Sequence, residues 1–174
     1  MTKLSVVIPA YNEERNLKRG VLDEVRSYLE EKSLEYEVII VDDGSSDQTK
    51  EIIKKYIIPN NKYKLIENSH GGKAIAVMTG MMAGEGEIIL FTDMDQATPI
   101  DQLEKFLPKF EEGFDIVIGS RSGRKGAPLV RKLSAWGFSL LLVLILGLPF
   151  KDTQCGFKAF SKESVEKILT KIKV

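Results

Sequence analysis

The sequence predicts an α/β protein in which helices cover both faces of a mostly parallel β-sheet. Short runs rich in Val and Ile alternate along the chain with segments whose apolar residues recur at helical spacing. Several runs are continuously apolar, which is typical of strands buried on both faces. Alternating strands and helices form layered α/β domains, and 174 residues are enough for one domain with a core. We therefore expect a single domain over residues 1–174.

Three strands and three helices are expected in the first half of the chain. The strands are at residues 5–8, 36–41 and 63–67, and Pro9 is expected to close the first. Each strand is followed by a helical pattern, carried by Leu17, Val21, Val25 and Leu29, then by Ile52, Ile53 and Tyr56, and finally by the residues from Lys73 through Met82. Gly44 permits a tight turn after the second strand, and Ser45 or Ser46 is expected to cap the next helix.

The second half of the chain adds three strands and three helices. Strands are expected at residues 87–92, 115–119 and 152–160, and helices at residues 99–110, 130–146 and 161–173, the last capped by Ser161. Residues 120–128 are basic and glycine-rich, so we expect a loop there. Residues 135–148 are strongly apolar but fall short of the roughly 20 residues that span a membrane. This segment is expected either in the core or at a membrane surface.

Two carboxylates stand one residue apart after the fourth strand, in the string IILFTDMDQATP at residues 88–99. Asp93 and Asp95 follow a buried strand at its carboxyl end, where open α/β sheets bind their ligands. Residues i and i+2 of an extended chain face the same way, and two carboxylates that close need a counter-cation to stay ionised. Mg²⁺ or Mn²⁺ suits carboxylate oxygens and can share ligands with a diphosphate. The alternative is an acidic loop that only caps the next helix.

The loop before Lys73 contains two glycines and the only histidine of the chain, His70. A Walker phosphate loop is excluded because Glu67 stands where its first glycine would be and Ala74 follows the lysine. Lys73 beside a helix N-terminus remains a candidate contact for an anion. We interpret His70 as a surface loop residue rather than a catalytic base.

The composition excludes some classes of function. Lys and Arg together number 25, as do Asp and Glu, and the resulting net charge of zero argues against bulk electrostatic binding of nucleic acid. Cys155 is the only cysteine, so the chain has no internal disulfide and a reducing compartment is expected.

Four loops at expected strand ends carry polar signatures: PAYNE at residues 9–13, DDGS at 42–45, DMD at 93–95 and GSR at 119–121. This ordered set resembles the inverting nucleotide-sugar glycosyltransferases with the GT-A fold. The string DTQCGFK at residues 152–158, with DMDQAT at 93–98, looks most like the dolichyl-phosphate β-glucosyltransferases. The resemblance covers essentially the whole chain and implies a three-layer α/β/α domain with a Rossmann-like sheet.

The resemblance also implies roles for individual residues. Pro9, Tyr11 and Glu13 would line the nucleotide pocket. Asp43, with Asp42 beside it, would accept a hydrogen bond from the base, although helix capping is an alternative for either carboxylate. The whole implied nucleotide-sugar-binding set is Pro9, Tyr11, Glu13, Asp42, Asp43, Lys73, Asp93, Met94 and Asp95, with Asp93 and Asp95 as ligands of Mg²⁺ or Mn²⁺.

The implied reaction moves glucose from UDP-glucose to a polyprenyl (dolichyl) phosphate with inversion. A lipid phosphate is already an anion, so the reaction needs positioning and charge neutralisation rather than a general base. Arg121 and Arg131 are candidates to hold the acceptor phosphate, because a guanidinium matches a phosphate bidentately. Ser134, one helical turn from Arg131, could add a hydrogen bond. The expected catalytic residues are Asp93, Asp95, Arg121 and Arg131.

Two other functions stay open from the sequence. The first is mannosyl transfer from GDP-mannose, or another reaction of the same family. The second is binding of a nucleotide sugar without turnover, because family members continue beyond the last helix and we expect a catalytic domain truncated at its C-terminus. The expected location is the cytoplasm, with the cytoplasmic face of a membrane as the alternative.

Overall fold

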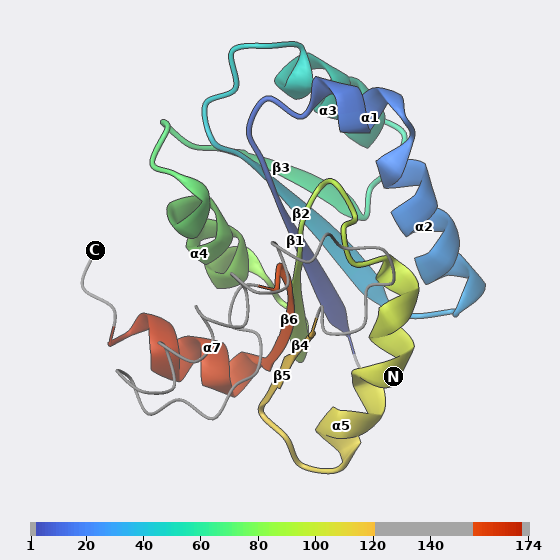
Figure 1. Ribbon diagram of the computed structural model, residues 1–174, viewed down its shortest axis with the longest axis vertical. Helices are drawn as coiled ribbons and strands as arrows, with labels where there is room; N and C mark the ends of the chain where they lie inside the picture. The colour runs from blue at the N-terminus through green and yellow to red at the C-terminus, as the bar shows by residue number, and fades with distance from the viewer. Residues whose placement is uncertain (1–2, 121–154, 172–174) are drawn as a thin grey trace, which may run out of the picture.

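The computed structural model describes residues 3–120 and 155–171, which form one six-stranded sheet with its helices (Figure 1). The strands are β1 (Leu4–Ala10), β2 (Tyr36–Asp42), β3 (Tyr63–Glu67), β4 (Ile88–Thr92), β5 (Ile116–Ile118) and β6 (Phe157–Ser161). The helices are α1 (Glu14–Lys18), α2 (Val21–Glu31), α3 (Thr49–Ile57), α4 (Lys73–Ala83), the 3₁₀ helix η1 (Ile100–Lys105), α5 (Leu107–Glu111) and α7 (Lys162–Leu169).

The sheet has the strand order β3-β2-β1-β4-β6-β5. Strands β1 to β4 pair in parallel, whereas β6 is antiparallel to both of its neighbours. The prediction of a mostly parallel sheet is therefore confirmed. Because β6 runs the other way, its first residue, Phe157, pairs with Thr92, the last residue of β4. The start of β6 thus lies beside the acidic loop that follows β4.

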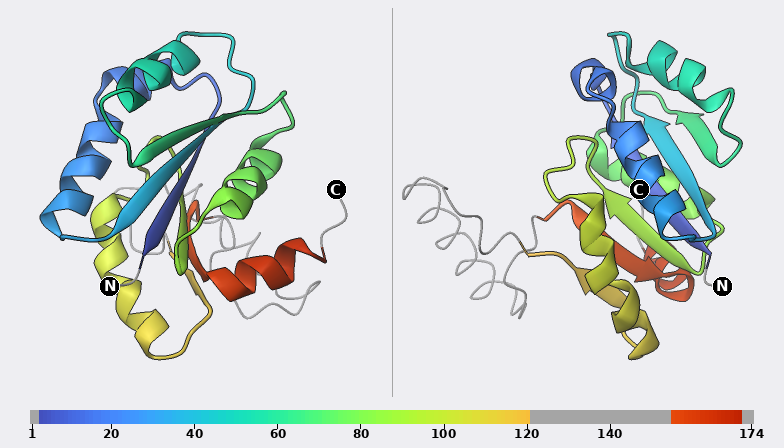
Figure 2. Two further views of the ribbon diagram at one scale, coloured as in Figure 1. Left: turned by 180° about the vertical axis from the view of Figure 1, so that it is seen from behind. Right: turned by 90° about the vertical axis from the view of Figure 1, so that its right-hand side faces the viewer.

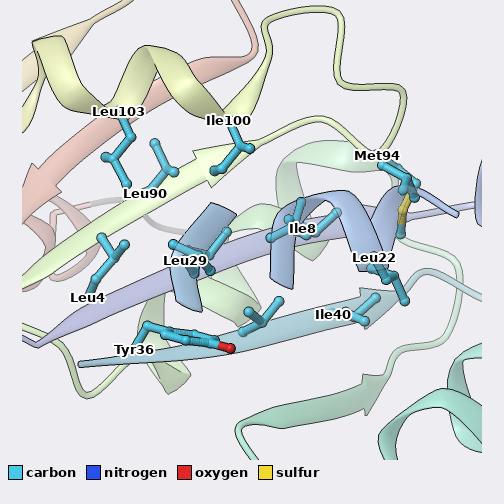
Figure 3. Close-up of a cluster of buried hydrophobic side chains, with 14 of the residues drawn as sticks. Leu4, Ile8, Leu22, Leu29, Tyr36, Ile40, Leu90, Met94, Ile100 and Leu103 are labelled. Carbon is cyan, nitrogen blue, oxygen red and sulfur yellow. The ribbon is translucent and has the colours of Figure 1, made fainter. Parts of the chain in front are cut away.

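Helices cover both faces of the sheet, which confirms the three-layer arrangement (Figure 2). One face packs against α1, α2, α3 and η1, and Figure 3 shows part of the core between them: Leu4, Ile8, Leu22, Leu29, Tyr36, Ile40, Leu90, Met94, Ile100 and Leu103. On the opposite face, Val7 and Ile89 pack against Met81 of α4 and Val165 of α7. Burial of each large aliphatic side chain contributes about 1.5–3 kcal/mol. Burial on both faces explains why the strands are continuously apolar.

The first strand is longer than predicted, since β1 continues through Pro9 to Ala10. Pro9 is tolerated because β1 pairs with β4 only from Leu4 to Val7. Beyond Val7 only β2 remains as a neighbour, so the missing N–H of proline leaves no second ladder incomplete.

Two helices that the sequence predicts as continuous are each divided. Gly20 has a φ of 90° and separates α1 from α2, so the spacing that begins at Leu17 crosses a break. The segment predicted as a helix at residues 99–110 consists of η1 and α5. Its break falls just before Pro108, which cannot donate to the preceding turn and would clash with it.

The capping predictions have mixed outcomes. Ser45 and Ser46 do not cap α3, because the N–H of Thr49 donates to Asp47 Oδ1 at 2.9 Å. Ser161 caps α7 as predicted, and its Oγ accepts from the N–H of Ser164 at 3.2 Å. The predicted turn at Gly44 is confirmed by a φ of 74°. The predicted helix at residues 130–146 lies outside the described residues, as does the first part of the strand predicted at 152–160.

Candidate active site

An open pocket of about 230 Å³ lies at the carboxyl ends of β1, β2 and β4. Three of the predicted polar loops meet there, because the carboxyl ends of parallel strands share one edge of the sheet. The lining residues are Pro9, Ala10, Tyr11, Glu13, Asp43, His70, Lys73, Ala76, Asp93, Met94 and Asp95. Every residue predicted to bind the nucleotide sugar is among them except Asp42.

The acidic loop after β4 presents its two carboxylates as predicted. Met94 is only 1% exposed and packs into the core, so its neighbours Asp93 and Asp95 both line the pocket. Asp95 is held by the N–H of Ala97, which donates to its Oδ1 at 2.8 Å. Because the buried Met94 side chain anchors the loop, the carboxylates of Asp93 and Asp95 on either side of it are held in place.

Two further side chains donate hydrogen bonds to the backbone of this loop. Arg19 Nη2 donates to the backbone oxygen of Asp95 at 3.3 Å. Gln96, whose φ is 49°, donates from Nε2 to the backbone oxygen of Asp93 at 3.1 Å. The left-handed backbone at Gln96 turns the chain sharply away from the strand. Sequence reasoning assigned no role to either residue.

Lys73 is the cation of the pocket. It is the first residue of α4, and its Nζ lies 2.6 Å from Asp93 Oδ1. This contact is an ion pair without hydrogen-bond geometry, since Oδ1 is buried and accepts no hydrogen bond. Lys73 is therefore more than a solvated loop lysine, because it neutralises one of the two predicted metal ligands.

Glu13 brings a third carboxylate to the pocket. Burial, the largest cause, raises the pKa of Glu13 above its ordinary value, and the charges of Asp95 and Asp93 raise it further. A hydrogen bond from Asn16 opposes the shift without cancelling it. The raised pKa of Glu13 therefore reflects its burial first and the charges of the two neighbouring carboxylates second.

The residues present fit a divalent cation that completes its coordination with an outside ligand. Asp93 Oδ1 is a buried oxygen that accepts no hydrogen bond, and Asp95 keeps one carboxylate oxygen beyond its bond to Ala97. Within residues 3–120 and 155–171, no group of three or more His, Cys, Asp or Glu side chains is arranged to hold a metal ion. Two carboxylates would therefore share the ion with a diphosphate and water, an arrangement typical of Mg²⁺.

The other end of the pocket is built around Asp43. Its carboxylate accepts from the N–H of Gly71 at 3.0 Å and of Gly72 at 2.8 Å. His70 Nδ1 lies 2.9 Å from Asp43 Oδ2. An ionised carboxylate has about four acceptor positions, so these contacts leave capacity for one more donor. Asp43 orders the loop before α4 in addition to lining the pocket.

His70 is a pocket residue that sequence reasoning missed. Its ring stacks on Tyr11, with 4.4 Å between the ring centroids and 29° between the planes. The pair joins the loop after β1 to the loop after β3. The sequence offered one signal, because the only histidine stands in a glycine-rich loop at the expected ligand-binding edge. The stack itself depends on two loops far apart in the chain and carries no local pattern.

The sequence that builds this pocket matches a known protein family. Residues 5–169 match the family described as Glycosyl transferase family 2. The chain belongs to this family. The family assignment covers the strands and loops that line the pocket, which all lie within the matched residues.

The curated relatives of this family 2 chain include several dolichyl-phosphate beta-glucosyltransferases. One, ALG5A of Trichomonas vaginalis, is 40% identical over 179 residues, which cover 95% of this chain and 55% of the relative. The Homo sapiens protein is 35% identical over 193 residues, covering 99% of this chain and 59% of the relative. The chain thus spans somewhat more than half the length of these relatives.

Solved structures confirm the GT-A glycosyltransferase fold. A mannosyltransferase from Pyrobaculum calidifontis, solved with GDP-Man and Mn²⁺, matches with a TM-score of 0.66 and 21% identity over 96% of this chain and 46% of that one. The glucosyl-3-phosphoglycerate synthase of Mycobacterium tuberculosis, solved with UDP, matches with a TM-score of 0.65 and 25% identity, covering 93% and 57% respectively. At this identity the Pyrobaculum match supports the fold alone.

The remaining site predictions concern Asp42 and the residues expected to hold the acceptor phosphate. Asp42 is 1% exposed, ends β2 and accepts from the N–H of Ser45 at 3.3 Å, so its place is structural. Arg121, Arg131 and Ser134, predicted to hold the acceptor phosphate, lie outside the described residues, as does the apolar segment 135–148. In the part of the chain that the structure describes, no helix has the length and apolar character needed to cross a membrane.

Proposed function

We propose that this chain is the catalytic domain of a metal-dependent glycosyltransferase that moves glucose from UDP-glucose to a polyprenyl (dolichyl) phosphate with inversion. One observation carries the proposal: Lys73, Asp93 and Asp95 converge on a pocket in a chain that is 35–40% identical to dolichyl-phosphate beta-glucosyltransferases. The family 2 assignment gives the reaction class. The names of these relatives are the basis for proposing dolichyl phosphate as the acceptor and glucose as the sugar.

The charges of the pocket support a nucleoside diphosphate as the ligand. A bound Mg²⁺ or Mn²⁺ at Asp93 and Asp95 would neutralise the leaving diphosphate. Lys73 lies at the start of α4, and a helix N-terminus favours anions. When the donor binds, the Lys73 ammonium group can leave Asp93 and pair with a phosphate oxygen instead. This exchange keeps the ammonium paired before and after the donor binds.

The base would lie at the other end of the pocket. Tyr11 is 46% exposed and offers an aromatic face for stacking. Asp43 retains one acceptor position, which suits a single ring N–H of uracil. A pocket of about 230 Å³ suits the single ring of uracil better than the larger guanine.

The acceptor phosphate would be held by Arg121, Arg131 and Ser134. Guanidinium groups bind phosphate bidentately, and the phosphate attacks as an anion without a general base. Because the tail of the acceptor is lipid, the transfer would take place at a membrane surface, and the reducing compartment expected from the single cysteine favours its cytoplasmic side.

Release of UDP tests the whole proposal. The purified chain is incubated with UDP-glucose and Mn²⁺, with and without dolichyl phosphate, and free UDP is measured over time. We expect release that depends on the lipid phosphate and stops when the metal is chelated. Lipid-independent release would contradict the assigned acceptor. No release despite binding of UDP-glucose would leave nucleotide-sugar binding as the function of this chain.

A thermal-shift comparison tests the donor separately. A ligand at about 100 times its dissociation constant adds roughly 2.7 kcal/mol, or about 5–11 °C for a domain of this size. We expect UDP and UDP-glucose with Mn²⁺ to raise the melting temperature, and GDP and GDP-mannose to leave it unchanged. Stabilisation by GDP alone would replace glucosyl by mannosyl transfer.

A further inference from the structure

The start of β6 lies beside the acidic loop that follows β4. Strands β4 and β6 are antiparallel, and their last pair is Thr92 with Phe157. Continuing this register by one residue places Gly156 opposite Asp93. The sequence singles out the surrounding string at residues 152–158 only as a family signature, without a physical role for its glycine.

Gly156 leaves the space that the Asp93 side chain occupies. A Cβ atom added to Gly156 would lie within 2.7 Å of Asp93 Cγ, Oδ1 and Oδ2, and these are the three nearest heavy atoms. Real Cβ atoms do not approach other atoms so closely, so any side chain at this position must displace the carboxylate. The backbone of Gly156 does not have the positive φ found at Gly20, Gly44, Gly72 and Gly113. Glycine is therefore required here for space and not for backbone conformation.

The backbone on both sides of Gly156 is anchored. Phe157 is fully buried and packs edge-to-face against Phe106, with 5.0 Å between the ring centroids. Cys155 is 1% exposed, and its Sγ lies 3.7 Å from Thr98 Oγ1. Because close-packed neighbours hold both flanks, β6 cannot move back to admit a larger residue, and the Asp93 side chain is the group that must move.

We propose that Gly156 is a positioning residue that seats the Asp93 carboxylate for the divalent cation and for Lys73. The proposal rests on the proposed function for the role of the cation, whereas the seat itself is a property of the fold. A side chain at position 156 pushes the carboxylate out of the space that it occupies beside Gly156. The ion pair with Lys73 and the metal ligand are then lost together, although Asp93 itself is still present.

A double-mutant cycle on thermal stability tests the seat without substrate or metal. Gly156→Ala is made in the wild-type chain, in Asp93→Ala and in Asp93→Asn. Overpacking a tight site costs about 2–12 °C in melting temperature for a domain of this size. We expect such a drop in the wild-type and Asp93→Asn chains, because the amide is as large as the carboxylate, and almost none in Asp93→Ala. An equal drop in melting temperature in all three backgrounds would contradict the claim that Gly156 leaves space for the Asp93 side chain.

Binding of UDP tests the role toward the cation. Calorimetry is run with and without Mn²⁺ on the wild type, on Gly156→Ala and on Gly84→Ala. Gly84 is a matched control, since the three atoms nearest to an added Cβ there belong to Ser5 and Ile89, 3.1–3.3 Å away, and Gly84 does not line the pocket. Residues that orient metal ligands typically change affinity about 10–100-fold. We expect that loss in the Mn²⁺-dependent affinity of Gly156→Ala alone, with metal-free affinity unchanged.

The two measurements separate failure of this inference from failure of the proposed function. If Mn²⁺ does not strengthen UDP binding in the wild type, the metal-dependent function is wrong while the stability cycle still decides the seat. If Gly156→Ala keeps the full effect of Mn²⁺, the positioning role is wrong even where the wild type behaves as proposed.

Discussion

The two ends of the sheet each hold a glutamate, and the two glutamates differ in the number of hydrogen bonds that they accept. At the amino end, Glu37 of β2 accepts hydrogen bonds from Ser5 Oγ at 2.7 Å, from the N–H of Glu85 at 2.7 Å and from Lys64 Nζ at 2.9 Å. At the carboxyl end, Glu13 lies in the pocket and accepts one bond from Asn16 Nδ2 at 2.5 Å.

The pKa values of these two groups move in opposite directions. Burial alone would raise the pKa of Glu37, but its three hydrogen bonds and the charge of Lys64 outweigh burial and hold the pKa below its ordinary value. For Glu13 burial prevails and raises the pKa, assisted by Asp95 and Asp93. The difference teaches that the fold supplies Glu37 with enough partners to offset its burial, whereas it leaves Glu13 in the pocket without them.

Asp95→Asn is expected to have the largest effect, and it acts only at the carboxyl end. The substitution removes the charge that the cation needs and keeps an oxygen for the N–H of Ala97. We expect Mn²⁺-dependent UDP binding to fall by about 100-fold or more, while the melting temperature holds or rises because like-charge repulsion is relieved.

Isothermal titration calorimetry with UDP and Mn²⁺ measures this loss. Asp101→Asn is a suitable control, since Asp101 is an exposed aspartate in η1 that does not line the pocket. Unchanged affinity in Asp95→Asn would remove Asp95 from the metal site.

Glu37→Ala is expected to have the opposite effects from Asp95→Asn, because it should lower the stability of the fold and leave UDP binding unchanged. The substitution leaves Ser5 and the N–H of Glu85 without their acceptor in a buried place. We expect the free energy of unfolding to fall by about 2–4 kcal/mol, measured by urea denaturation. A fall in UDP affinity at a temperature where the variant is fully folded would show that the two ends are coupled.

The smallest effect is expected from Glu13→Gln. We expect this variant to be more stable than the wild type near neutral pH, which is opposite to the effect of the same substitution at Glu37. A raised pKa means that ionised Glu13 weakens the fold above that pKa, so the variant should gain about 0.5 kcal/mol near neutral pH. This gain should disappear as pH falls through the raised pKa toward 4.5, the ordinary value.

Glu37→Gln serves as the opposite pH control. The lowered pKa of Glu37 stabilises the fold fully above 4.5, and this contribution is lost as pH falls through the lowered pKa. The Gln variant should therefore be less stable than the wild type above pH 4.5 and approach it in acid. Two difference curves of the same sign, from unfolding between pH 3 and pH 8, would contradict the comparison.

The pocket was predictable from the sequence to an unusual extent because its residues follow strands directly. Asp93, Asp95 and Asp43 stand at strand ends that local apolar runs mark clearly. Residues whose role comes from another part of the chain were not predictable in this way. His70, Arg19 and Gly156 belong to this group, since each acts on a loop far away in sequence.

The sequence by itself determined the alternation of strands and helices, the edge of the sheet where the polar loops gather, and the identity of the paired carboxylates. These features depend on local periodicity and on the shared direction of parallel strands. Only the tertiary structure decided the antiparallel direction of β6, which places Gly156 against Asp93, and the approach of α4, which pairs Lys73 with that carboxylate. The physical reason is that such contacts depend on which surfaces bury each other, and local spacing along the chain does not encode that choice.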